Sequence, residues 1–214
     1  AGDDDSGDGD GDGDGGGGGG GVGGGGDVAA RGSPADAIKP RSAAEQAKLD
    51  AELHRAVASG NEARVVAAIA AGASVHSTMR QERSPLHVAC AHGRTGVALT
   101  LLEHAADANA VDDYGATPLM VAAVNQGLAL AEILLEGGAD PHMTRKDGKT
   151  ALHLAAETGE RGIVRLLLLQ GVASDLEDNS GRTPADLAES MAHWELGETL
   201  REDAAALMRD EAEL

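Results

Sequence analysis

The sequence predicts an all-α protein, a solenoid of about five stacked helix pairs joined by short hairpin-like turns. Three observations lead to this fold class. One pattern of residues recurs every 33 positions between about residues 45 and 200. Each full copy carries a motif that can start a helix, and each has two short apolar segments with helical spacing. Repeats of about 20 to 50 residues are typical of solenoids, in which a unit buries its apolar faces only against its neighbours.

The start of the first helix in each unit is marked by a recurrent motif, in which Ser or Thr is followed by Pro or Ala. The Ser or Thr side chain can cap the new helix. Proline at the first helical position loses no hydrogen bond, because its amide would be unpaired there anyway. The motif therefore predicts that helices begin at Pro85, Pro118, Ala151 and Pro184.

A second helix is expected in each unit, where a run rich in Leu follows about 17 residues after the motif. A small pair such as Gly138-Ala139 follows that run, and glycine suits the left-handed backbone that often ends a helix. Gly148 and its equivalents in the neighbouring units lie just before the next motif and predict a tight turn there. The predicted units lie near residues 46–78, 79–111, 112–144, 145–177 and 178–210.

The two ends of the repeat array differ from its middle. The first unit lacks the Thr-Pro motif, but Ser42-Ala43-Ala44-Glu45 has the form of a capping box, which predicts a helix start. The fifth unit ends in a predicted helix around Trp194 to Met208. We expect Trp194 to pack against the end of the stack, and Tyr114 to lie at the tip of a turn.

The first 40 residues differ in composition from the repeats. They contain nine Asp against only Arg31 and Lys39, and most of residues 1 to 26 are Gly. So little apolar surface cannot offset the entropy lost on ordering the chain. We therefore predict a disordered acidic tail over 1–40 and a folded repeat domain over 41–214. The tail lacks the features of a secretory signal or a transit peptide.

The overall composition excludes several classes of function. A formal net charge of -19, with one Trp, one Tyr and no Phe, argues against nucleic-acid binding, which needs clustered Lys and Arg or stacking aromatics. A single cysteine, Cys90, excludes an internal disulfide framework and favours an intracellular setting, with the cytoplasm or nucleus preferred. An organelle stays open if a segment precedes Ala1. No window has the roughly 18 consecutive apolar residues needed for membrane insertion.

No set of residues predicts catalysis, a cofactor or a metal site. Gly148-Lys149-Thr150 is similar to the end of a phosphate-binding loop, but the required earlier Gly is Met143, and the repeat explains the three residues. Asp8, Asp10 and Asp12 are spaced as in a calcium loop, whose closing Glu is missing here. Cys90 is expected to be a small buried residue. We therefore expect a non-enzymatic protein.

Two motifs carry a resemblance to a known family. Ser84-Pro85-Leu86-His87 and Thr150-Ala151-Leu152-His153, each followed by Ala two positions on, form a T-P-L-H-x-A box. Gly138-Ala139-Asp140-Pro141-His142 forms a linker of the G-A-D-x-N type. Together with the 33-residue period, these motifs resemble the ankyrin-repeat family over about residues 45 to 200. The resemblance implies a hydrogen-bonding structural role beside the turns for His54, His87 and His153.

The resemblance also implies how a partner is bound. Ankyrin repeats bind proteins through the turn tips and the exposed face of the first helices, which form a concave strip. We expect a protein partner and a chain that is monomeric without it. The candidate partner-binding residues are Arg80, Arg83, His92, Asp113, Tyr114, Asn125, Lys146, Lys149, Glu157 and Arg182.

Charge leaves two interpretations of this strip open. The predicted turns carry a small excess of positive charge, whereas the rest of the repeat region is acidic. Turns attract polar residues in general, so the excess can be incidental. It can also indicate a groove for an acidic or phosphorylated segment, with Tyr114 as aromatic anchor and four charge partners. Those charge partners would be Arg83, Lys146, Lys149 and Arg182.

Two hypotheses for function follow. The first is an adaptor or scaffold that displays a rigid binding surface, so that little ordering cost remains when the partner docks. The alternative is a regulatory inhibitor or assembly chaperone of an enzyme or client complex, whose acidic tail attracts basic partners.

Overall fold

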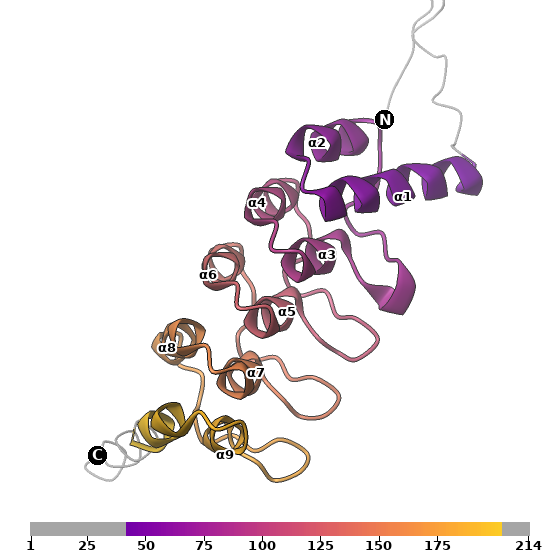
Figure 1. Cartoon of the computed structure of the whole chain (residues 1–214). Helices are drawn as coiled ribbons and strands as arrows, with labels where there is room; N and C mark the ends of the chain where they lie inside the picture. Colours follow the sequence, from indigo (N-terminus) through magenta and orange to yellow (C-terminus); the bar gives the residue numbers. More distant parts are fainter. Residues whose placement is uncertain (1–41, 203–214) are drawn as a thin grey trace, which may run out of the picture. The chain divides into compact units, whose positions relative to one another are not determined.

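The structure, a computed structural model, describes residues 42–202, and these residues form helix pairs stacked in sequence order (Figure 1). No strand occurs within that range. The predicted all-α solenoid is confirmed, and the predicted tail over 1–40 lies outside the described residues. The first two units contain α1 (Ala43–Ser59), α2 (Glu62–Ala70), the 3-10 turn η1 (Arg80–Glu82), α3 (Pro85–Ala91) and α4 (Thr95–Glu103). The next units contain α5 (Pro118–Val124), α6 (Leu128–Glu136), α7 (Ala151–Thr158), α8 (Arg161–Leu169) and α9 (Pro184–Ser190). A further helix begins at residue 194 and continues through 202.

The first helix of each later unit begins at the residue that the sequence predicts, and the expected caps are present. The Ser84 hydroxyl accepts a hydrogen bond from the amide of His87 (3.4 Å), and the Thr183 hydroxyl accepts one from Asp186 (3.2 Å). The capping box at the start of α1 is also confirmed, because the amide of Ser42 donates to the Glu45 carboxylate (2.9 Å). These bonds satisfy amides that helix geometry leaves unpaired.

The helices form two rows. The first helices α1, α3, α5, α7 and α9 pack against one another in order, and the second helices α2, α4, α6 and α8 form the other row. Figure 1 shows the hairpin turns projecting from the side of the first-helix row. The turns and the first helices are therefore neighbours along the whole stack.

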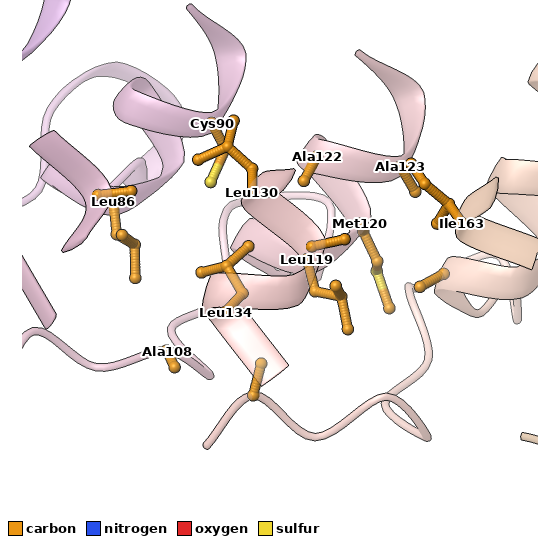
Figure 2. Close-up of a cluster of buried hydrophobic side chains, with 14 of the residues drawn as sticks. Leu86, Cys90, Ala108, Leu119, Met120, Ala122, Ala123, Leu130, Leu134 and Ile163 are labelled. Carbon is orange, nitrogen blue, oxygen red and sulfur yellow. The ribbon is translucent and has the colours of Figure 1, made fainter. Parts of the chain in front are cut away.

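The core lies between the two rows and follows the repeat period. Alanines on the first helices are fully buried, and this small side chain lets adjacent helices approach closely. They are Ala56, Ala89, Ala122, Ala155 and Ala188. Leucines of the second helices fill the remaining space, as Figure 2 shows for Leu130 and Leu134 around Leu119. Truncating a fully buried leucine such as Leu134 to Ala would cost about 2–5 kcal/mol.

The three repeat histidines are buried hydrogen-bonding residues, as expected. The His87 Nδ1 accepts from the Ser84 amide (3.3 Å), and its Nε2 lies 2.9 Å from the carbonyl oxygen of Ala116 in the next turn. The His153 Nδ1 accepts in the same way from Thr150 (3.2 Å). These bonds fix the neutral tautomer of His87 with the proton on Nε2. The His87 ring thus joins a helix start to the neighbouring turn.

The expectation for Trp194 is wrong. Its side chain is 64 % exposed, although it begins the last helix as predicted. Trp194 lies one repeat after Arg161 and two repeats after Leu128, which are the exposed first residues of α8 and α6. The inward face of the last helix is instead supplied by Leu196 and Leu200. The repeat geometry therefore directs this indole away from the core.

Replacing Ala105 by Gly should stabilise the fold. Ala105 has a φ of 61°, whereas the equivalent residues of the units before and after it are Gly72 and Gly138. Left-handed backbone costs a residue with a Cβ about 1–2 kcal/mol, and glycine's larger unfolded-state entropy cancels part of that gain. We expect a net gain of about 0.5–1 kcal/mol in the free energy of unfolding, measured by chemical denaturation. Gly138→Ala is the matched control and should lose a similar amount, while a less stable Ala105→Gly variant would contradict the argument.

Stability should fall when the buried histidines are protonated. Burial lowers the pKa of His54, His87 and His153, although nearby carbonyl and carboxylate groups oppose the shift. Below the ordinary histidine pKa of about 6.5, the unfolded chain therefore binds more protons than the folded chain, and the folded state loses stability as pH falls. We expect the free energy of unfolding to decrease from about pH 7.5 to about pH 5.5. His87→Gln should flatten this dependence, and an unchanged pH dependence in that variant would contradict the argument.

Candidate functional site

The hairpin turns are joined to one another by backbone hydrogen bonds. Each bond runs from an amide of one turn to a carbonyl of the preceding turn, so the turn tips form a continuous row. The donors and acceptors are Asp113 to Gln81 (3.0 Å), Lys146 to Tyr114 (3.0 Å) and Asn179 to Asp147 (2.9 Å). Because backbone atoms make these hydrogen bonds, the backbone positions of the tip residues are fixed relative to one another, and so are the points from which their side chains project.

Aspartates hold two of the turns in shape. One carboxylate oxygen of Asp112 accepts from the amides of Tyr114 and Ala116, both at 2.9 Å. Asp178 repeats this arrangement two units later and accepts from the amide of Arg182 at 3.0 Å. Burial alone would raise the pKa of Asp178, but the hydrogen bonds from its own turn outweigh burial and hold that pKa below its usual value. The carboxylate of Asp178 thus stabilises its own turn by accepting hydrogen bonds from the turn's backbone amides.

Arg145 replaces this aspartate in the fourth unit, at the position midway between Asp112 and Asp178. Its guanidinium instead pairs with Asp147, with Nε 3.0 Å from one carboxylate oxygen. The hydrogen bond from Arg145 lowers the pKa of Asp147. Arg145 is not among the residues predicted from the sequence. The sequence does contain a signal for Arg145, because one repeat has arginine at a position where the repeats before and after it have aspartate.

Three of the five predicted cationic residues already pair with carboxylates within the chain. The Lys149 ammonium lies 2.7 Å from the Glu157 carboxylate, and Lys149 is only 8 % exposed. The Arg83 Nε lies 3.6 Å from the buried carboxylate of Asp112. The Arg182 guanidinium contacts Asp178 at 2.9 Å. The positive charge of the turns is therefore largely balanced locally.

Three adjoining hollows, which we call the docking groove, lie between the turns and the first helices. Their volumes are about 350, 490 and 530 Å³, and all three are lined by Arg145. Apolar side chains form much of the surface, and the charged pairs lie around them. The principal lining residues are Arg83, Tyr114, Val124, Asn125, Arg145, Lys146, Asp147, Lys149, Leu154, Glu157 and Met191. An apolar centre with a polar rim is the usual anatomy of a protein interface.

The structure brings six of the ten predicted residues together in this groove. They are Arg83, Tyr114, Asn125, Lys146, Lys149 and Glu157. Tyr114 is 54 % exposed at a turn tip, as expected. The other four do not line these hollows, and they are Arg80, His92, Asp113 and Arg182. His92 follows α3 as an exposed residue, so its helix position alone does not direct it into the groove.

The reactive groups of the described residues are few. Cys90 is fully buried, and burial raises the pKa of its thiol to about 12, so the nucleophilic thiolate is scarce at neutral pH. Within residues 42–202, no three His, Cys, Asp or Glu side chains gather as a metal site. No helix in this same range is both long and apolar enough to cross a membrane.

The comparison with protein families agrees with this architecture. The family model described as ankyrin repeats (3 copies) matches residues 53–145 and 124–209. The chain belongs to the ankyrin-repeat family. Ankyrin repeats are generic protein–protein interaction modules, and their fold is typically non-enzymatic. A search of the curated proteins found no match to this chain.

The Lys149–Glu157 pair should stabilise this ankyrin fold. Lys149→Glu would place two carboxylates together at a mostly buried position, so we expect a loss of about 1–3 kcal/mol in the free energy of unfolding. Adding Glu157→Lys should restore part of that loss. Lys146→Glu is an exposed control in the same turn and should change stability by less than about 1 kcal/mol. Equal effects of the two single changes would contradict a structural role for Lys149.

Proposed function

We propose that the chain is a non-enzymatic adaptor or scaffold that holds one partner protein in the docking groove. The observation that carries this proposal is the position of Tyr114. Its side chain is more than half exposed, while its own amide and carbonyl are held by Asp112 and Lys146. A large aromatic side chain on a fixed backbone can contact a partner with little further ordering cost.

The docking groove favours apolar contacts over recognition of an acidic or phosphorylated segment. Such a segment would compete with carboxylates already placed beside Arg83, Lys149 and Arg182. The apolar side chains around Tyr114, in contrast, have no partner group to displace. Val124 and Met191 are exposed large hydrophobic residues of this groove. Burying such surface supplies about 25 cal/mol per Å² before the costs of association.

A regulatory inhibitor or assembly chaperone remains the second candidate, supported by the acidic composition of residues 1–40. A clustered negative charge would increase the rate of encounter with a basic partner and make that rate sensitive to salt. Deleting residues 1–40 separates the candidates. A regulator that uses this segment should lose association rate and salt dependence, whereas an adaptor that relies on the groove should retain both.

Tyr114→Ala should weaken capture of the partner by at least about tenfold, because truncating an aromatic anchor typically costs about 2 kcal/mol or more. The measurement is quantitative affinity capture from a cell extract, with wild-type protein in parallel. Thermal unfolding of the variant should be unchanged within about 0.5 kcal/mol, because Tyr114 is exposed. Leu169→Ala removes another exposed side chain, one outside the docking groove, and should leave capture intact. Equal capture by the Tyr114 variant would contradict the proposed surface.

A further inference from the structure

A fourth hollow continues the docking groove toward the last helix. It has a volume of about 290 Å³ and is lined by Arg161, His193, Trp194 and Glu195, among others. His193 lines both this hollow and the neighbouring part of the docking groove. The His193 ring lies over Gly159, where an added Cβ would come within 2.5 Å of a ring atom. Because Gly159 has no side chain, the His193 ring can occupy this place, where it borders both hollows.

The chain's two large aromatic side chains lie at the two ends of this combined surface. The sequence has one Tyr, one Trp and no Phe. Tyr114 is 54 % exposed at the turn end, and Trp194 is 64 % exposed at the helix end. Val124 and Met191, both exposed, lie between them along the lining. Tyr, Trp and Arg dominate binding energy at interfaces, and an exposed apolar run of this kind marks an interaction surface.

The charge around Trp194 differs from that around Tyr114. At the turn end, Arg83 and Arg145 are balanced by carboxylates of neighbouring turn residues. At the helix end, Arg161 pairs with Glu195 at 3.1 Å, whereas Glu198, one turn after Trp194 on the same helix face, makes no ion pair within residues 42–202. A Lys or Arg placed over the indole could contact this carboxylate and the face of the ring together.

We propose that the docking groove extends over His193 to Trp194, and that its occupant is a partner-protein segment of defined chemistry. The segment carries apolar side chains along Tyr114, Val124 and Met191, and a Lys or Arg at the end that covers Trp194 and Glu198. This assignment rests on the proposed function, because it extends the same surface and names what the surface accepts. The formal net charge of -12 on residues 41–214 favours the same basic partner at longer range.

The test uses the full chain and a displayed library of random linear peptides as the probe. Peptides selected on the wild-type protein should share bulky apolar positions with a Lys or Arg at one end, and few acidic residues. Because Trp194 is the only tryptophan, its fluorescence should shift to shorter wavelength when such a peptide covers it. Trp194→Ala and Tyr114→Ala should each weaken binding about tenfold or more, and Leu169→Ala should stay within about twofold.

Each other outcome has a distinct meaning. Peptides that depend on Tyr114 but not on Trp194 would overturn the extension and leave the proposed function standing. Peptides that depend on neither aromatic residue, or a library without any binder, would overturn both. An acidic or phosphorylated consensus would overturn the assigned partner chemistry. A fluorescence shift that follows the protein's own concentration, with a dimer in sedimentation, would make a second copy of this chain the occupant and would overturn the proposal.

Discussion

The structure depends on close packing between units that cannot bury their own apolar faces. Fully buried alanines at the same position of every repeat let the first helices lie against one another, and leucines of the second helices fill the space behind them. Because small side chains leave no room for adjustment, each unit fixes the position of the next. The turns therefore repeat with the same spacing as the helices, and the backbone of each turn tip forms a hydrogen bond with the tip before it.

This rigidity explains why the turn charges are paired within the chain. Once neighbouring turns are fixed, a carboxylate such as Asp112 can satisfy its own turn and face Arg83 of the preceding turn. Lys149 precedes the first residue of α7 and Glu157 lies near its end, so the same helix positions both side chains. A surface whose charges are already partnered recognises other proteins through its apolar area, with the charges contributing selectivity at the rim.

Two departures from the repeat pattern lie in the docking groove. Arg145 stands where the neighbouring units have aspartate, and it lines all three hollows of the docking groove. Gln126 has a φ of 61° at a position where Gly93 and Gly159 stand in adjacent units, and it lines the groove as well. Strained or irregular positions that persist in an otherwise regular fold often belong to functional surfaces.

Local rules made the helix starts predictable. Pro118 begins a helix because a capping threonine and a proline at the first position act within one turn of chain. The structural role of His87 followed from the resemblance to ankyrin repeats. The sequence also placed Tyr114 at a tip. It did not reveal the Lys149–Glu157 pair, the meeting of the hollows at His193, or the outward direction of Trp194. The repeat register aligns Trp194 with Leu128 and Arg161, but only the structure shows that this position faces outward. The contact of Lys149 with Glu157 and the position of His193 between the hollows depend on packing distances and side-chain directions that a periodic pattern does not contain.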